Sequence, residues 1–399
     1  MFETVQKLPP DPILGLNQVF QEDNNPEKIN LSVGVYQNDA GLTPIFSAVK
    51  KAEQELLRLQ ETKSYAPQAG DPTFNDQISR LILTDKIVEN LGSKLSTVMT
   101  PGGCGALRML AELLVRARAQ TTLWVSTPTW GNHFPLLESA GLSLKEYAYY
   151  DANLRGIDFE ATQESLNLIP KGDVVLLHGC CHNPTGADFT HEQWDKVIDI
   201  LAEREITAFF DVAYQGFGDG LDEDAYAIRQ AVQRLPEVII ASSCSKNFGL
   251  YRERTGAAII VSQSQQATAA ATSQLLAAAR TSYSMSPYHG GGIVAHLLSN
   301  KDLRDEWINE LEQMRVNMNG LRERLASSLN QAQDTIDFGF LARSKGMFCF
   351  LGIAREDVLT LRSEFGIYLL ESTRINVAGL SDKNLPVIVQ RVSDVITRN

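Results

Sequence analysis

The sequence predicts an α/β fold, with a mostly parallel central sheet flanked by helices in a large domain and a second, smaller α+β domain. Three observations predict it. Short apolar runs recur through the middle of the chain, patterns of helical period separate several of them, and long charged helical patterns begin at about residue 300. The length of 399 residues also exceeds what one hydrophobic core usually serves, so two domains are expected.

The apolar runs end in polar or small residues, which is typical of buried strands that lead into loops. They occupy residues 122–126, 173–179, 206–211, 237–243 and 256–261, and helices are expected at 193–205 and 224–235. An α/β sheet binds its ligands beyond the carboxyl ends of its strands. The residues that follow these runs are therefore the first candidates for a functional site.

Three further segments have a distinct character. The Ala-rich segment 267–280 predicts a buried helix, and the apolar stretch 347–353 belongs to the second domain. The first 15 or so residues contain Pro9, Pro10 and Pro12, which cannot lie inside a helix, so they predict an extended arm. Such an arm commonly packs on a partner subunit.

The composition argues against several classes of function. With 36 basic and 48 acidic residues the net charge is -12, so neither nucleic acid nor a membrane surface is an expected partner. The N-terminus lacks the pattern of a secretory signal, and no apolar run approaches the roughly 20 residues of a membrane span. The five scattered cysteines do not resemble a disulfide framework, so a cytoplasmic location is expected.

Lys246 is the first candidate for chemistry. It lies three residues beyond an apolar run, with Ser243 and Ser245 before it and Arg252 and Arg254 after it. A single lysine at such a place is ordinarily a solvated loop residue. Here the hydroxyls and cations form an anion site, and neighbouring cations lower the pKa of a lysine toward the neutral amine that forms a Schiff base.

Asp211 closes another apolar run, and Tyr214 follows it at a spacing of three. Such an aspartate can simply lie in a loop or cap a helix. A carboxylate at the end of a buried strand nevertheless has a high desolvation cost unless it meets a positive partner. A protonated pyridine nitrogen is one such partner, and a pyridoxal ring needs that proton to accept electrons.

Residues 178–186, HGCCHNPTG, allow two interpretations. Zinc is disfavoured because adjacent cysteines on an extended backbone point to opposite faces, and because the usual ligand spacing and a second cluster are missing. No metal is therefore expected. Asn183, fixed by Pro184 in a tight turn, is expected instead to donate its amide to a ligand oxygen.

The stretch at 100–119, TPGGCGALRMLAELLVRARA, has four small residues directly ahead of an amphipathic helix. Free backbone N–H groups and the positive end of the helix dipole meet there, which favours a phosphate, although glycines also serve in plain turns. The stretch is not a Walker loop, because no GK[ST] follows. It is not a dinucleotide fingerprint either, because Arg108 stands where the third glycine would be.

Three more residues are candidates for binding. Trp130 follows the first apolar run and offers an aromatic plane at the same edge of the sheet. Arg280 and Arg374 are candidates for gripping carboxylates, because a guanidinium pairs with them bidentately. Taken singly, the tryptophan is more often a core residue and each arginine a surface residue.

Together these motifs resemble the fold-type I aminotransferases that depend on pyridoxal 5′-phosphate (PLP), and within class I the aspartate/aromatic subgroup. The resemblance runs from DPILGL at 11–16 to RINVAGL at 374–380. Its most specific element is SCSKNFGLYRERTG at 243–256, which is similar to the family's cofactor-lysine pattern, with Lys246 at the Schiff-base position.

The resemblance implies PLP covalently bound to Lys246, with the pyridoxamine phosphate form during turnover, and catalytic roles for Lys246, Asp211 and Tyr214. The implied cofactor contacts are Gly102, Gly103, Cys104, Trp130, Asn183, Asp211, Tyr214, Ser243, Lys246, Arg254 and Tyr65. The implied substrate contacts are Gly34, Trp130, Asn183, Arg280 and Arg374, supported by His133 and His178. No metal is implied.

The resemblance also implies a homodimer with shared sites, because Tyr65 and Arg280 would come from the partner subunit. The implied organisation is an N-terminal arm at 1–12, a small domain at 13–43 and 311–399, and a large PLP-binding domain at 44–310.

Two residues depart from the family's pattern. Thr255 stands where an aliphatic residue is usual, which should be mild. Cys104 stands where the family usually has the hydroxyl of Thr or Ser. A thiol is a poorer hydrogen-bond donor, so slightly weaker cofactor retention is expected.

The implied reaction moves the amino group of an amino acid to a 2-oxo acid, 2-oxoglutarate above all. Arg280 predicts dicarboxylate substrates. Strict aspartate enzymes of the subgroup tend to carry Lys, Asn and Asn at the positions of Gln37, Ser64 and Met285. The less polar pocket here favours dual specificity for aspartate and aromatic amino acids, since methionine is an adaptable surface for a ring. A strict aspartate aminotransferase is the alternative.

Two other classes of protein remain open. A PLP-dependent β-lyase or decarboxylase would share the same lysine, aspartate and arginine set. A non-enzymatic regulator on this fold would need a DNA-binding extension, which a chain with a net charge of -12 does not offer.

Overall fold

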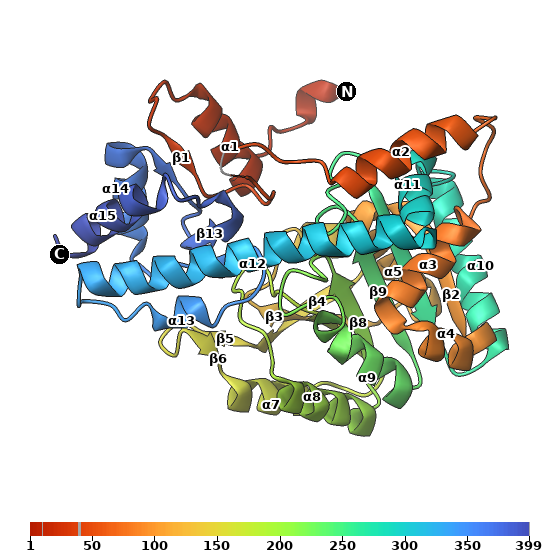
Figure 1. Cartoon of the computed structure of the whole chain (residues 1–399). Helices are drawn as coiled ribbons and strands as arrows, with labels where there is room; N and C mark the ends of the chain where they lie inside the picture. The colour runs from red at the N-terminus through yellow and green to blue at the C-terminus, as the bar shows by residue number, and fades with distance from the viewer. Residues whose placement is uncertain (10, 39–40, 399) are drawn as a thin grey trace.

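A seven-stranded sheet forms the centre of the protein in the computed structural model, which describes residues 1–9, 11–38 and 41–398. The strands lie in the order β2 (Leu95–Pro101), β10 (Thr255–Val261), β9 (Val238–Ser243), β8 (Thr207–Val212), β7 (Val174–His178), β3 (Thr122–Thr127) and β4 (Ser143–Ala148). Only β10 runs against its neighbours, so the predicted mostly parallel α/β sheet is confirmed (Figure 1).

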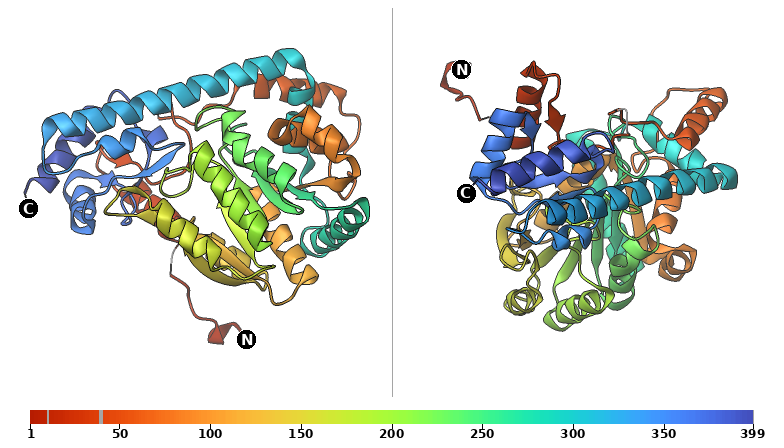
Figure 2. Two further views of the ribbon diagram at one scale, coloured as in Figure 1. Left: turned by 90° about the horizontal axis from the view of Figure 1, so that it is seen from below. Right: turned by 60° about the vertical axis from the view of Figure 1, so that its left-hand side comes forward.

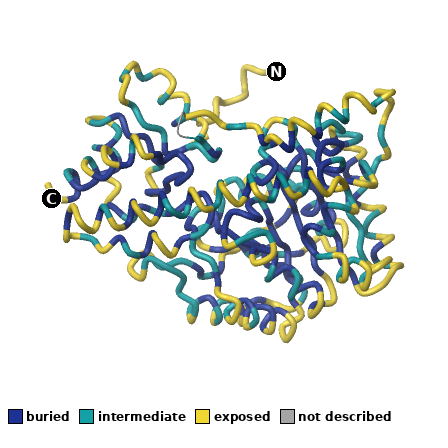
Figure 3. The backbone as a smooth tube through the Cα atoms, viewed as in Figure 1, coloured by how far each residue is buried: buried dark blue, intermediate teal, exposed yellow. Residues whose placement is uncertain are grey.

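Helices cover both faces of this sheet, because its strands are apolar on both sides. In β8, Phe209 faces one core cluster, and Ala208 and Phe210 face the other. The first face is covered by α5 (Gly102–Ala117), α6 (His133–Glu138) and α10 (Gln265–Ser282). The second is covered by α2 (Ser47–Leu59), α3 (Pro72–Leu83), α4 (Asp85–Leu91), α7 (Phe159–Asn167), α8 (His191–Arg204), α9 (Tyr226–Arg234) and α11 (Tyr288–Ser299). In Figure 3 most of the central strands carry the dark blue of buried residues. This double cover is what parallel sheets require.

A long helix, α12 (Lys301–Ala332), links the large domain to a smaller group of elements (Figure 2). That group contains α1 (Pro12–Glu22), β1 (Ile29–Asn30), α13 (Gly339–Ala342), β11 (Phe348–Phe350), α14 (Arg355–Phe365), β12 (Ile367–Tyr368), β13 (Arg374–Asn376) and α15 (Leu385–Ile396). β1 pairs with β12 and β11 pairs with β13, so segments from both ends of the chain meet there. α12 passes unbroken through position 311, and the domain boundaries stay predictions.

The remaining short elements connect these layers. They are β5 (Tyr150–Asp151), β6 (Gly156–Ile157), and the 3₁₀ turns at Phe2–Thr4, Gly92–Lys94, Glu223–Ala225 and Val377–Gly379. No helix among the described residues is long and apolar enough to cross a membrane.

The predicted extended arm of about 15 residues is too long. A 3₁₀ turn occupies Phe2–Thr4, and α1 begins at Pro12. The Asp11 carboxylate accepts hydrogen bonds from the backbone N–H groups of Ile13 and Leu14 and caps this helix. Proline is well suited to the first position of a helix, where its missing N–H has no partner to lose. Pro10 lies outside the described residues.

The prediction of a buried helix at 267–280 is half right. The helix forms as α10, but only Thr268, Leu275, Ala278 and Ala279 are buried, and most of its other side chains are exposed or half-buried. Alanine content predicts helix and not burial, because the small side chain is tolerated on either face.

Candidate active site

A cavity of ≈ 220 Å³ lies beyond the carboxyl ends of β7, β8 and β9. Most of the residues that the sequence singled out line it: Gly34, Gly103, Cys104, Trp130, His178, Asn183, Asp211, Tyr214, Ser243, Lys246, Arg254 and Arg374. Parallel strands end at the same edge of a sheet, which explains why segments far apart in the sequence meet here.

Lys246 lies in the loop after β9, three residues beyond its last residue. Burial, together with the positive charges of Arg254 and Arg374, lowers the pKa of its amine, and the charge of Asp211 opposes this shift. The Lys246 Nζ atom lies 5.2 Å from the ring centroid of Tyr214. An amine whose pKa is lowered is a better nucleophile and proton acceptor.

Asp211 lies at the end of β8 and forms one end of a buried hydrogen-bonded chain. Its Oδ2 lies 3.1 Å from His133 Nε2, and the Thr129 hydroxyl lies 2.8 Å from His133 Nδ1 and 3.0 Å from His178 Nε2. Burial alone would raise the pKa of Asp211, but the bond from His133 and the nearby positive charges outweigh it and lower the pKa. Because a carboxylate only accepts, His133 Nε2 donates to Asp211.

The predicted phosphate site has the expected composition but a different local structure. The four small residues do not precede the helix; they form the first turn of α5, which begins at Gly102 directly after β2. A Cβ at Gly102 would lie 2.6 Å from an Arg254 nitrogen, and one at Gly103 would lie 2.9 Å from Ser243 Cβ. Glycine therefore lets the backbone N–H groups, a guanidinium and a hydroxyl face one space.

Cys104 lies in the same turn and is half-buried. Burial raises the pKa of its thiol, although the charges of Arg254 and Lys246 act in the opposite direction. The side chain is therefore a neutral thiol at the edge of the cradle.

Arg374, at the start of β13, is buried with a relative exposure of 3%. Its Nη1 donates to Asn183 Oδ1 (3.2 Å), its Nη2 donates to the carbonyl of Ser32 (3.0 Å), and its Nε has no partner among the described residues. The guanidinium also lies 4.1 Å from the ring centroid of Phe348. Burial lowers its pKa to about 10. A buried cation without a carboxylate partner leaves a place for an acidic ligand.

Gly34 packs closely against the Phe348 ring. A Cβ there would lie 2.9 Å from Phe348 Cζ.

Tyr214, which lines the same cavity, keeps its hydroxyl protonated, because burial raises its pKa above the usual range. It can therefore donate a hydrogen bond at neutral pH.

Comparison with known proteins identifies the family of the chain. Residues 26–392 match the family described as aminotransferase class I and II. The chain belongs to this family. It is 44% identical to the aspartate aminotransferase of Escherichia coli (strain K12), over 99% of this chain and 100% of that protein. It is also 44% identical to the aromatic-amino-acid aminotransferase of Paracoccus denitrificans, over 97% of each.

A solved structure is similar over nearly the whole length of both chains. The aromatic-amino-acid aminotransferase from Burkholderia pseudomallei, covalently bound to pyridoxal phosphate, shares 38% of its sequence with this chain at a TM-score of 0.95, with 99% of each covered. The resemblance inferred from the sequence is confirmed, and the protein is a PLP-dependent aminotransferase.

Four predicted site residues of this aminotransferase do not line the cavity: Gly102, His133, Tyr65 and Arg280. Gly102 and His133 lie directly behind its lining, where they contact Arg254 and Asp211, respectively. Tyr65 is 93% exposed, and it lines a separate hollow of ≈ 350 Å³ with the exposed Arg280 and with Met285. In that hollow Arg280 donates to the Ser284 hydroxyl. Tyr65 and Arg280 thus line the same hollow, separate from the cavity that contains Lys246.

One argument against zinc was wrong. The backbone at Cys181 is not extended but left-handed (φ 52°), so the sulfurs of Cys180 and Cys181 and a carboxylate oxygen of Asp224 lie within 4.8 Å of one another. Burial raises the pKa of the Cys181 thiol well above its usual range, and three backbone N–H groups already occupy Asp224. Both features oppose metal binding.

Sequence reasoning missed several residues of the aminotransferase's cavity, including Ile13, Tyr251 and Phe348. Tyr251 accepts a hydrogen bond from the backbone N–H of Tyr36 (3.0 Å), which joins the lysine loop to the segment after Gly34. Its position in the sequence, five residues after Lys246, could have indicated that it lies near the site. Ile13 and Phe348 are apolar residues of the small domain, and no local pattern marks such residues as site-forming.

Proposed function

We propose that this enzyme transfers the amino group of aspartate and of aromatic amino acids to 2-oxoglutarate, with PLP carried on Lys246. The observation that carries the proposal is that Arg374 is buried in the same cavity as Lys246 and Asp211 and pairs with no carboxylate among the described residues. An amine, an anion cradle, a carboxylate and a buried cation together match PLP with a bound amino acid.

The residues present fit the cofactor. Gly102, Gly103 and Cys104 would hold its phosphate by backbone N–H groups, with Ser243 and Arg254 completing the cradle. Asp211, whose pKa is held low, would pair with the ring nitrogen. When bound, PLP supplies a protonated ring that accepts electrons from the substrate.

The remaining ring contacts follow from donor and acceptor directions. Asn183 turns its Oδ1 to Arg374, which leaves its Nδ2 free to donate to the phenolic oxygen of the ring. The protonated Tyr214 hydroxyl would donate to the same oxygen. Trp130 would stack on the ring. His133 would keep Asp211 in place by its hydrogen bond, and His178 would support His133 through the Thr129 hydroxyl.

The residues of this chain would hold the α-carboxylate end of the substrate. Arg374 would bind the α-carboxylate, and the backbone at Gly34 would approach it closely. Lys246 Nζ would then take the proton from the α-carbon, because its lowered pKa favours the neutral amine.

A homodimer would complete the site. Tyr65 and Arg280 share a separate hollow, which supports their contribution to a neighbouring subunit's phosphate and distal carboxylate, respectively. A cytoplasmic location is part of the proposal, and the five cysteines are all free.

Similarity alone does not decide the substrate, because an aspartate and an aromatic-amino-acid aminotransferase are equally similar to this chain. Met285 beside Arg280 supports tolerance of an aromatic ring, as do Gln37 and Ser64 in place of more polar residues. A strict aspartate aminotransferase is the alternative, and a β-lyase or decarboxylase is the alternative of another class.

The test is a single-turnover experiment with the cofactor-loaded enzyme. Aspartate and phenylalanine should each convert the bound cofactor to its amine form and release one equivalent of 2-oxo acid, and Lys246→Ala should bind dicarboxylates without this conversion. Turnover by Lys246→Ala would contradict the assigned lysine. An aspartate preference above roughly 10⁴-fold, about 5.5 kcal/mol, would favour the strict enzyme. Oxo-acid release without amino transfer would favour the lyase.

A further inference from the structure

Two aspartates that the proposed function does not use, one half-buried and one buried, lie next to the active site. Asp188 is half-buried, and Asp224 is buried with a relative exposure of 6%. Both line a hollow of ≈ 640 Å³ together with Cys180, which also lines the active-site cavity. This hollow and the active-site cavity therefore share Cys180 as a lining residue.

Asp188 fixes the backbone that leads to Asn183. Its two carboxylate oxygens accept hydrogen bonds from the N–H groups of Cys181 (2.6 Å) and His182 (2.8 Å). Cys181 has a left-handed backbone (φ 52°), which is unfavourable for a residue with a side chain. The carboxylate offsets that cost, and the next residue but one, Asn183, contacts Arg374.

Asp224 does the same for the loop that follows Tyr214. Its Oδ2 accepts from the N–H groups of Gly216 (2.8 Å) and Gly218 (2.9 Å), and its Oδ1 accepts from that of Asp219 (2.8 Å). These donors begin two residues after Tyr214. The backbone N–H groups of a loop have no partners in a helix or sheet, so hydrogen bonds to one carboxylate fix the conformation of this loop.

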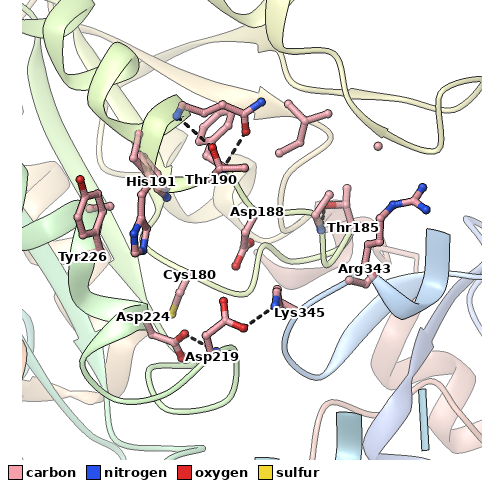
Figure 4. Close-up of a pocket in the computed structure, with 18 of the residues that line it drawn as sticks. Cys180, Thr185, Asp188, Thr190, His191, Asp219, Asp224, Tyr226, Arg343 and Lys345 are labelled. Atoms are coloured by element: carbon pink, nitrogen blue, oxygen red, sulfur yellow. Dashed lines mark hydrogen bonds and ion pairs between the residues drawn. The ribbon is translucent and has the colours of Figure 1, made fainter. Parts of the chain in front are cut away.

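The two loops also contact each other. The Cys181 thiol lies 3.8 Å from the carbonyl oxygen of Tyr214 and donates to it. Figure 4 shows Asp188 and Asp224 on either side of Cys180, with Asp219 paired to Lys345 nearby. Neither Asp188 nor Asp224 forms an ion pair among the residues that the structure describes.

Such an arrangement is costly for stability. Burial raises the pKa of Asp188 to about 6, and the nearby charges of Asp224 and Asp219 add to this shift. Burial also raises the pKa of Asp224, although its three N–H partners act in the opposite direction. Burying carboxylates without a cation stabilises a fold poorly, so their effect on loop geometry is the better explanation for their presence.

We propose that Asp188 and Asp224 are positioning residues, which hold Asn183 and Tyr214 in place to donate hydrogen bonds to the phenolic oxygen of the cofactor. This inference rests on the proposed function. Hydrogen bonds donated to an oxygen favour its charged form, so loosening either donor raises the apparent pKa of the bound cofactor.

The experiment measures that pKa by absorbance against pH in the cofactor-loaded enzyme. Asp188→Asn and Asp224→Asn each replace one acceptor oxygen by an amide that cannot accept an N–H. Each should raise the apparent pKa by about 0.7 unit, which is about 1 kcal/mol at about 1.36 kcal/mol per unit. Asp222→Asn is the matched control, because Asp222 is 80% exposed on the same loop and should leave the pKa unchanged.

The outcomes separate this inference from the proposed function. A pKa in both variants equal to that of the control would overturn the positioning role, even if thermal unfolding shows that the variants are less stable. Absence of any cofactor absorbance in the unmodified enzyme would instead refute the proposed function. If a variant does not fold, hydrogen exchange of the unmodified enzyme replaces it: the amides of 181, 182, 216, 218 and 219 should be protected, and rapid exchange of all five would overturn the inference.

Discussion

Replacement of Arg374 by lysine tests the proposed binding of the substrate α-carboxylate most directly, because it keeps the positive charge and removes the planar guanidinium group. In the structure Nη1 is engaged by Asn183 and Nη2 by Ser32, while Nε is buried without a partner. A substrate carboxylate would use Nε and a remaining Nη proton in a bidentate pair. A lysine ammonium forms one such bond at this position instead of two.

The expected loss is one charge-assisted hydrogen bond, about 1.5–3 kcal/mol, which corresponds to a decrease in kcat/KM of roughly 10- to 150-fold. Because every amino acid carries an α-carboxylate, aspartate and phenylalanine should lose equally. The ratio of kcat/KM for aspartate to kcat/KM for phenylalanine should therefore stay the same, and this ratio does not depend on the fraction of folded enzyme.

The assay is steady-state kinetics with both amino acids and 2-oxoglutarate. Arg391→Lys is the matched control, because Arg391 lies on α15 and is 43% exposed, where it pairs with Asp394. An unchanged kcat/KM, or a loss confined to one of the two substrates, would refute the assignment of Arg374 to the α-carboxylate.

Two further predictions concern the cradle and the buried histidines. Cys104→Thr adds a hydroxyl donor at the phosphate and should tighten PLP binding about 5-fold, for about 1 kcal/mol; an unchanged dissociation constant would count against a weakened cradle. Burial, aided by His133, lowers the pKa of His178 to about 3, below its usual 6.5. The unfolded chain therefore binds one more proton in this window, and stability falls as pH decreases from 6.5 toward 3. His178→Gln should reduce the slope of unfolding free energy between pH 4 and 6 by about 1.36 kcal/mol per pH unit, as measured by urea titration; parallel curves would contradict this.

The fold was predictable where sequence patterns are long and local. The five apolar runs became β3, β7, β8, β9 and β10, because strands buried on both faces are apolar without interruption. The two- and three-residue strands of the small domain have no such signal, since they depend on contacts between distant segments such as Ile29 and Ile367.

The site was predictable where the strands bring residues together. Lys246 and Asn183 follow β9 and β7, Asp211 lies at the end of β8, and these three parallel strands end at one edge. The local backbone was less predictable: Cys181 is left-handed and its N–H donates to Asp188, and the small residues lie inside α5 and not ahead of it. Asp188 and Asp224 were missed because each is a single acid, Asp188 in a loop and Asp224 in the 3₁₀ turn Glu223–Ala225.

The most direct test of the cofactor lysine is borohydride reduction of the purified enzyme followed by peptide mass spectrometry. Reduction converts a lysine–PLP linkage to a stable secondary amine that marks its position. The proposal predicts the phosphopyridoxyl group on the peptide that contains Lys246, and its loss when aspartate is added before reduction. A label on another lysine, or no label on an enzyme that catalyses transamination, would contradict the account.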